Sequence, residues 1–293
     1  MRKLILFFLA ICLAGLLCSE NYQEEVRQWR ENRLARLTAP DGWLSLAGLF
    51  WLQEGKNSFG SGPDNTLQVM NDEFPKQAGV FEVSADRVVF RAQPGVEVFR
   101  EDKTVDSLEL VSDLKGRPTL LRTGAFSWHL IQRSELLGVR LKWADHPNRS
   151  KQKEIPAFPI DPAWRMEADF RPYEQPRKLL ITSIVGTASE EECPGEIHLT
   201  IKGEKIVLYP TGSRDSLSLL FGDASNGRES YIGGRFLPLG RPDEKNEIVV
   251  DFNLAYSPPC AFTPFATCPM VLPENIIPLA VTAGEKEAGL FDH

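Results

Sequence analysis

The sequence predicts an all-β protein made of antiparallel sheets in a sandwich-like or barrel-like arrangement, with one N-terminal helix. Three observations lead to this fold class. Most apolar runs after residue 40 alternate with a period of two, the spacing of a half-buried strand. These runs are short, and many are separated by Gly or Pro, of which the 293 residues contain 22 and 21. This length also suffices for one large β domain with a sizeable core.

The helix is expected over residues 21–38. Its apolar residues keep near-helical spacing, and they are Tyr22, Val26, Trp29, Leu34 and Leu37. Asn21 precedes Glu24 by three residues, which is the pattern of a capping box. Pro40-Asp41-Gly42 then ends the helix.

The strands follow in chain order after the helix. They are predicted at residues 87–91, 126–131, 137–143, 164–170, 196–201, 205–209, 217–221, 231–237, 248–252 and 276–281. Gly203-Glu204 is expected to form a tight hairpin turn between two of them. The loop 144–159 is the best candidate boundary between two β subdomains, although one continuous domain is favoured.

Residues 1–19 are predicted to form a signal peptide. Met1-Arg2-Lys3 is a short cationic start, and residues 4–17 carry no charge. That length fits a signal sequence better than a membrane span. Three outcomes stay open: lipidation of Cys18, despite the large Leu17 before it; cleavage after Cys18 or Ser19; and an uncleaved anchor.

Each outcome places residues from about 20 onward outside the cytosol. We therefore expect an exported protein, located in the periplasm, in the cell envelope or in the medium. Contact with a membrane is expected only through the leader or through a lipid anchor on Cys18.

The charge balance and the absent motifs exclude several functions. With 33 Lys and Arg against 40 Asp and Glu, the net charge is −7. An acidic chain without a basic run is a poor nucleic-acid ligand, so no nucleic-acid partner is expected. The Gly-x-Ser-x-Gly elbow, the phosphate loop, the dinucleotide fingerprint and the His-Glu-x-x-His zinc helix are all missing. No cofactor is predicted.

The C-terminal part of the sequence is the most specific. Residues 251–269 read DFNLAYSPPCAFTPFATCP, and Ala283-Gly284-Glu285-Lys286 follows. Upstream lie Tyr231-Ile232-Gly233-Gly234-Arg235 and Asp41-Gly42-Trp43-Leu44. Together these motifs resemble the bacterial DUF1684 family, a domain of unknown function.

The resemblance runs from about Glu25 to Lys286, so it covers nearly the whole mature chain. It implies a single DUF1684-type β-rich domain over residues 20–293, and it implies no known reaction. One departure is Ser257, where the family pattern has Asn, and this weakens any role built on an amide side chain there.

Three segments far apart in the sequence place charged or amide groups next to Gly or Pro. If strands 231–237 and 247–252 form a hairpin, Arg235 and Asp251 are neighbours, and a strand from residue 276 delivers Glu285 beside them. Glycine lets a backbone approach a ligand closely. The predicted ligand-binding residues are Arg235, Asp251, Asn253, Glu285 and Lys286. The alternative is an ion-pair cluster that holds the C-terminal loop, with Asp251 and Asn253 capping its backbone amides.

Cys260 and Cys268 are predicted to lie close together, because a proline-braced loop of eight residues has little reach. In an exported protein a disulfide between them is permissible and expected, which leaves Cys193 free or buried. Three other readings stay open, the simplest being two buried, inert thiols. A thiol pair acting as nucleophile or redox couple needs a cation such as Arg235 or Lys286 nearby. A metal site is disfavoured by the eight-residue spacing, and no metal is predicted.

The predicted strands around residues 126–143 carry a second polar face. His129 shares that face with Ser127 and Arg133, and Arg140 lies on the next strand. Arginine side chains suit carboxylates and phosphates. The face is thus either the lining of an anion site or an exposed hairpin surface.

Together these features predict an exported β protein that binds a small polar or anionic ligand in a cleft. An enzyme using Cys260 or the carboxylates of Asp251 and Glu285 is one alternative. A structural envelope protein is the other.

Overall fold

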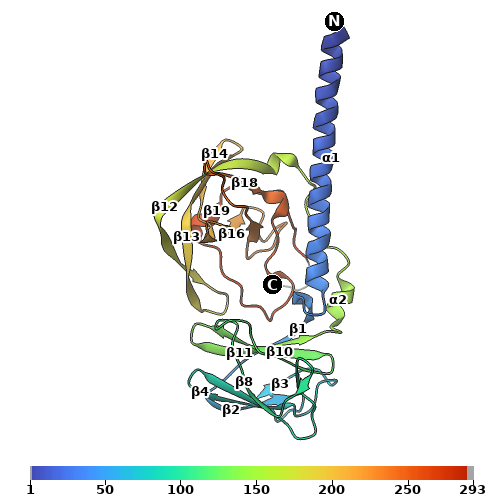
Figure 1. The fold of residues 1–293 in the computed structure, drawn as a ribbon, viewed down its shortest axis with the longest axis vertical. Coiled ribbons are helices and arrows are strands. Elements are labelled where there is room, and N and C mark those ends of the chain that lie inside the picture. The colour runs from blue at the N-terminus through green and yellow to red at the C-terminus, as the bar shows by residue number, and fades with distance from the viewer. Residues whose placement is uncertain (1, 289–293) are drawn as a thin grey trace.

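The computed structural model describes residues 2–288, with side chains from residue 20 onward. Its strands form four sheets, and the long helix α1 (Arg2–Thr38) runs beside the two C-terminal ones (Figure 1). Nearly all strand pairs are antiparallel; β2·β3 and β16·β19 are parallel. Within the described residues no sheet closes into a barrel. The predicted all-β class with an N-terminal helix is confirmed.

The two N-terminal sheets enclose one core. The first has the order β1 (Leu46–Trp51), β11 (Leu136–Trp143), β10 (Phe126–Arg133), β9 (Leu120–Thr123), β6 (Phe99–Arg100), β7 (Lys103–Thr104). The second has the order β3 (Leu67–Gln68), β2 (Gly55–Gly60), β4 (Gly79–Ser84), β5 (Arg87–Ala92), β8 (Ser107–Glu109). Their shared core is rich in aromatic rings, among them Phe59, Phe81, Phe90 and Trp128.

Alternation along β10 and β11 decides which side chains reach that core. Trp128 and Leu130 are buried in it. His129 and Arg133 occupy the intervening positions, so they point to the other face of the sheet. Arg140 lies directly opposite His129 in the antiparallel register and shares that face.

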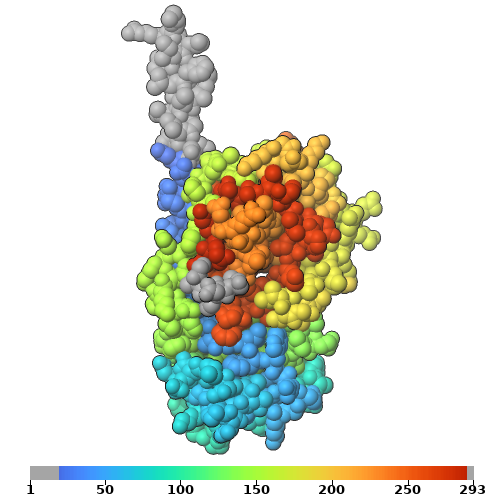
Figure 2. Space-filling model, turned by 180° about the vertical axis from the view of Figure 1, so that it is seen from behind, coloured from blue at the N-terminus to red at the C-terminus, as the bar shows by residue number. Residues whose placement is uncertain are grey.

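The two C-terminal sheets form a second core. One has the order β14 (Glu204–Leu208), β13 (Ala188–Ile201), β12 (Arg165–Thr182), β18 (Glu247–Asp251). The other has β15 (Thr211–Ser213), β16 (Ser216–Asp223) and β17 (Arg235–Pro238), with β19 (Ile276–Ile277) on β16. Phe170, Leu219, Phe221 and Phe252 lie at the centre of this core. Seen from behind, these orange and red segments rest directly on the blue and cyan N-terminal sheets (Figure 2).

Short helical turns connect the strands. They are η1 (Trp43–Ser45), α2 (Pro147–Lys151), η2 (Pro162–Trp164), η3 (Phe252–Leu254), η4 (Pro259–Ala261) and η5 (Pro273–Asn275). A third apolar cluster joins the end of α1 to η1 and η4 and includes Leu37, Leu44, Cys260 and Phe262. This cluster packs the end of the helix, the turn that leads into β1 and the C-terminal loop together.

The long hairpin β12–β13 also bridges the two halves. Its tip reaches the turn between β10 and β11 (Figure 1), where the Ser134 hydroxyl donates to the carbonyl of Ala188 at 2.7 Å. The same tip binds the loop after Cys268, since the Met270 amide donates to the carbonyl of Thr182 at 2.7 Å.

Several sequence-based expectations need correction. The helix runs from Arg2, so Asn21 does not cap it; its amide instead bonds Glu25 one turn later at 2.8 Å. Strand 231–237 is shorter than expected, because a turn closed by the Gly234 amide on the Tyr231 carbonyl precedes β17. Strand 276–281 is reduced to β19.

The predicted hairpin between residues 201 and 205 is confirmed, with its turn one residue earlier than expected. Ile201 pairs with Glu204, so Lys202 and Gly203 form the turn. Both have positive φ, 51° and 89°, as a type I′ turn requires.

The predicted signal peptide, residues 1–19 with Cys18, lies outside the residues whose side chains are described. No helix in the described part of the chain has both the length and the apolar composition needed to cross a membrane.

Candidate functional site

Arg235, the first residue of β17, is completely buried and internally paired. Its Nη2 lies 2.7 Å from a carboxylate oxygen of Asp223 and 2.9 Å from the carbonyl of Val281. Its Nη1 donates to the carbonyls of Ala283 and Glu285 at 2.5 and 3.3 Å. The side chain therefore fixes the segment 281–285 against β16 and β17.

Asp251 and Asn253, at the end of β18, anchor the helix. The Tyr22 hydroxyl lies 2.9 Å from both Asp251 carboxylate oxygens, and Asn253 Nδ2 donates to that hydroxyl at 2.8 Å. The amide of Asn253 also exchanges two hydrogen bonds with the Asp161 backbone, at 2.9 and 3.0 Å. Both side chains thus tie α1 and η2 to the sheet.

Glu285 is buried and also binds α1. Its carboxylate accepts from Arg33 Nε at 3.2 Å and from the Ser257 amide at 2.7 Å. Burial raises the pKa of Glu285, and Arg33 opposes that shift. The neighbouring Lys286 is half-buried, and its Nζ lies 3.6 Å from Glu229.

The hairpin predicted to unite these residues was wrong. β18 pairs with β12, and β17 pairs with β16, so Arg235 and Asp251 belong to different sheets. The polar atoms of the five predicted ligand-binding residues mostly form hydrogen bonds within the fold. Other residues line the cavities described below. The contacts match the ion-pair alternative, in which the cluster holds the C-terminal loop.

The predicted proximity of Cys260 and Cys268 is confirmed, since the Cys260 amide lies 3.2 Å from Cys268 Sγ. The predicted disulfide was wrong for this structure, because both thiols are free and linked by hydrogen bonding within the third apolar cluster. This hydrogen bonding, with help from Arg140, lowers the pKa of Cys260. The same interaction, together with burial, raises the pKa of Cys268.

A cavity of about 560 Å³ lies where the end of α1, the polar face of β10 and β11, and the loop 259–269 meet. We call it the arginine cavity. Its lining combines cationic and aromatic side chains, namely Arg33, Arg36, Arg133, Arg140, Trp29, Trp43, Phe236 and Tyr256.

Arg140 is the unusual member of this lining. Its side chain is only 6% exposed. Among the described residues it has no carboxylate in ion-pair contact, and its Nε, like that of Arg235, has no hydrogen-bond partner. Its one hydrogen bond is a long contact of 3.4 Å from Nη2 to the Thr267 hydroxyl, and its guanidinium lies 5.3 Å from the centre of the Trp43 ring.

The other arginines differ from Arg140 in their partners. Arg133 is paired with Asp113 at 2.9 Å, and Arg33 is paired with Glu285. Arg36 is exposed at the edge of the cavity. Among the described residues, Arg140 is therefore the buried arginine that has no carboxylate in ion-pair contact, and Asp113, which Arg133 binds, acts on it only at longer range.

Electrostatics around Arg140 confirm a cationic environment. Burial, followed by repulsion from Arg133, lowers the pKa of Arg140 to about 10, so the guanidinium is still protonated at neutral pH. Burial also lowers the pKa of His129 to about 4, and Arg140 and Lys142 add to that shift. His129 is therefore neutral at neutral pH.

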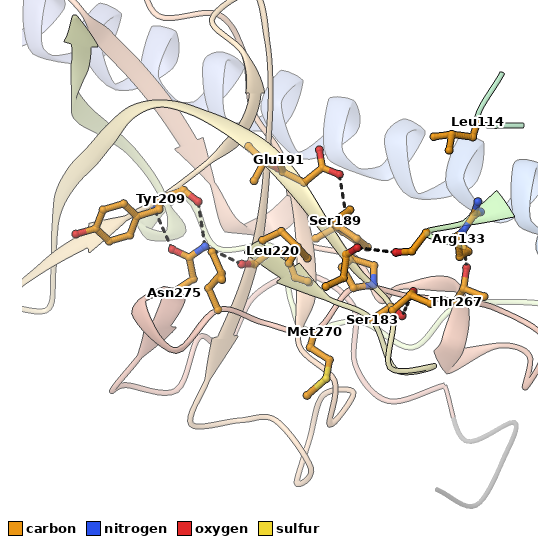
Figure 3. A pocket seen from close by; sticks show the side chains of 18 of the residues that line it. Leu114, Arg133, Ser183, Ser189, Glu191, Tyr209, Leu220, Thr267, Met270 and Asn275 are labelled. Carbon is orange, nitrogen blue, oxygen red and sulfur yellow. Dashed lines mark hydrogen bonds between the residues drawn. The ribbon is translucent and has the colours of Figure 1, made fainter. Parts of the chain in front are cut away.

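A second cavity, of about 470 Å³, adjoins the first and is called here the apolar cavity. Figure 3 shows its lining, in which the tip of β12–β13 faces the turn after β10 and the loop 267–275. The two cavities share four lining residues, which are Arg133, Phe236, Thr267 and Pro269. Across the described part of the chain, no three His, Cys, Asp or Glu side chains gather as a metal site would need.

The sequence pattern predicted part of this site and not the rest. It singled out Arg133, Arg140 and His129 as one reading of a polar strand face. It missed Arg36 and Trp43, because they come from the helix end and the following turn. The sequence did contain one indication of this cavity, the ATCP motif, because its Thr267 and Cys268 line the arginine cavity.

Comparison with known proteins finds one family model that matches part of the C-terminal half of the chain. Residues 150–286 match the model described as "Protein of unknown function (DUF1684)", which confirms the resemblance over that range. An uncharacterised protein of Haloarcula marismortui, solved by solution NMR, is 29% identical, with a TM-score of 0.40. That match covers 47% of this chain and 78% of the other. None of the curated proteins compared with the chain matches it.

Proposed function

We propose that this chain, whose residues 150–286 match the DUF1684 family, binds a small anion, a carboxylate or a phosphate, in the arginine cavity. The observation that carries the proposal is Arg140: a buried guanidinium without an ion-pair partner among the described residues, on the wall of a cavity. A bound anion supplies the missing charge and hydrogen-bond acceptors.

The energetic cost of leaving Arg140 unpaired supports this reading. Burying an ionised group without a partner is strongly unfavourable. An arginine that served only packing would be replaced at lower cost by an apolar side chain. Its planar fork of N–H donors is suited to the two oxygens of a carboxylate or phosphate.

A general attraction of anions by the whole protein does not account for the arginines around this cavity. The whole chain carries a charge of −7, so its long-range field repels anions. The selectivity for an anion is therefore local, and it comes from Arg140 with Arg36 and Arg133 around one cavity.

The same geometry favours binding over thiol catalysis. Cys268 is the thiol that lines the arginine cavity, and its pKa is raised. Because the thiolate is the nucleophile, this thiol is a weak one at neutral pH. Cys260, whose pKa is lowered, is buried and lines neither cavity. The carboxylates of Asp251 and Glu285 are engaged with Tyr22 and Arg33 and are not free for catalysis.

Titration calorimetry with sodium phosphate and sodium acetate, in a constant sodium chloride background, tests the proposal. We expect saturable binding of one anion per chain. Arg140→Gln should weaken it by about tenfold or more, because hydrogen bonds to charged groups contribute ~1.5–3 kcal/mol.

Arg122→Gln is the matched control. Arg122 lies on β9 of the same sheet, exposed and outside both cavities, so its loss should leave binding unchanged. Thermal unfolding of each variant establishes that it is folded. Equal binding by wild type and Arg140→Gln, or no saturable binding by wild type, contradicts the proposal.

A further inference from the structure

The apolar cavity contains many polar side chains, yet most of their hydrogen-bonding groups are already used. The side-chain amide of Asn275 accepts from the backbone amide of Tyr209 at 2.8 Å and donates to its carbonyl at 3.0 Å. It also donates to the carbonyl of Leu220 (Figure 3). The Ser183 hydroxyl is bonded to that of Thr187 at 2.8 Å. The surface left for a ligand is therefore largely apolar.

The rim of this cavity exposes large apolar side chains. Leu114 is 67% exposed and Met270 is 52% exposed, on opposite halves of the molecule. Leu220, Phe236 and Leu272 continue the apolar surface inside. The volume of about 470 Å³ lies within the range of small-molecule sites, about 300–1,000 Å³.

The junction between the two cavities is polar and cationic. The Thr267 hydroxyl lies 3.0 Å from Arg133 Nε and 3.4 Å from Arg140 Nη2, and Thr267 lines both cavities. Glu191, which is exposed, is the one carboxylate among the described residues that line the apolar cavity. An anionic head group is accordingly favoured at the arginine end, and an uncharged chain in the apolar cavity.

We infer that the anion of the proposed function is the head of a single-chain amphiphile. Its head group binds at Arg140, and its aliphatic chain lies past Thr267 in the apolar cavity, where it covers Leu114 and Met270. This inference rests on the proposed function and adds the chemical class of the ligand.

A chain-length series measured by titration calorimetry tests it, with sodium butanoate, hexanoate and octanoate below their micelle-forming concentrations. Each added methylene should tighten binding by up to about fourfold, the value of one buried CH₂ group. Octylammonium chloride has the same chain with a positive head, and it should not bind.

Two exposed methionines provide a matched pair of variants. Met270→Gln should weaken octanoate binding several-fold and leave phosphate binding unchanged. Met70→Gln should change neither, since Met70 is 87% exposed and outside both cavities. Both positions are exposed, so loss of folding is not the expected cause.

The outcomes separate this inference from the proposed function. If phosphate and acetate bind through Arg140 but affinity does not rise with chain length, the amphiphile is wrong and the anion site stands. If octylammonium binds as tightly as octanoate, or Arg140→Gln leaves octanoate binding unchanged, the placement of the head group is wrong. If no anion binds, both proposals fall.

Discussion

Arg140 and Arg235 are buried to a similar degree, and their partners differ. Arg235 faces Asp223 and several backbone carbonyls, so its charge is neutralised within the fold. Arg140 has the single long hydrogen bond to Thr267. A buried pair is strongly destabilised when one partner is removed, whereas a lone buried charge is itself destabilising. The two residues should therefore respond in opposite ways to the same substitution.

Arg235→Met is expected to lower the free energy of unfolding by about 3–5 kcal/mol, because Asp223 is left buried without its partner. Arg140→Met is expected to raise it by about 1 kcal/mol, because an incompletely satisfied charge is removed. Urea unfolding of the anion-free protein measures both values. An equally large loss in both variants would show that Arg140 stabilises the fold and would weaken the case for a site.

His129 makes the free energy of unfolding depend on pH. Its folded pKa is about 4, and an unfolded histidine titrates near ~6.5. Between these values the unfolded chain binds a proton that the folded chain does not. The contribution of the neutral His129 to the free energy of unfolding is therefore complete above about pH 6.5. It is lost progressively as the pH falls toward 4, and the total loss is up to about 3 kcal/mol.

Urea unfolding at pH 7 and pH 5 measures this loss. His129→Gln should flatten the difference between the two pH values, since glutamine does not titrate. His198→Gln, on β13 away from this face, serves as the control. An unchanged pH dependence in His129→Gln would contradict the assignment.

At the level of elements, α1 is held to the C-terminal sheets by a few polar contacts together with an apolar stripe. Tyr22 and Val26 are buried, and Leu37 is fully enclosed near the end of the helix. Arg30 donates to the carbonyl of Phe158 at 3.1 Å. Because Trp29, Arg33 and Arg36 line the arginine cavity, the position of α1 decides the shape of the site.

Tyr22→Phe tests this anchoring. The substitution removes the hydroxyl that Asp251 and Asn253 share, and Asp251 is left with fewer donors in a buried position. We expect a loss of about 1.5–3 kcal/mol, as for a hydrogen bond to a charged group, measured by urea unfolding. Tyr173→Phe should cost less, because Glu196, which its hydroxyl bonds, is partly exposed and keeps a second partner in His198. Equal costs would argue against a special role for Tyr22.

At the scale of the whole molecule, the candidate site lies between two separate cores. The N-terminal core is centred on Phe59 and Trp128, and the C-terminal core on Phe221 and Phe252. Both cavities take lining residues from each half, so neither half builds the site by itself. A ligand that spans the junction would stabilise the packing of the halves by mass action.

We also propose that the protein is exported, with the mature chain beginning near residue 18 to 20. Among the described side chains, the buried contacts of α1 begin at Tyr22, so removal of the first 19 residues leaves them in place. Intact mass of protein from its native host tests this. We expect a species lacking the leader, with added lipid mass if Cys18 is acylated. Full-length material in the cytosol would contradict export.

The local pattern alone was enough to predict many of the strands and the helix end, although it missed the strands at residues 46–51, 55–60 and 79–84. Val88 and Phe90 alternate with polar neighbours, and Pro40-Asp41-Gly42 follows the helix, so these features depend on residues close in sequence. The same pattern separated Trp128 from His129 on the two faces of β10. It also predicted the pairing of 126–131 with 137–143, where the connecting turn is short and the hairpin partner is the neighbour in sequence.

The sequence by itself thus determined the all-β class, the end of the helix, the acidic charge and the family resemblance of the C-terminal block. Only the tertiary structure decided that β18 pairs with β12 rather than with β17. It also decided that Arg235 has a carboxylate in ion-pair contact while Arg140, among the described residues, has none. The physical reason is that strand partners and counter-charges distant in sequence are selected by the packing of whole sheets. A pattern of neighbouring residues contains no information about which buried charge finds its partner.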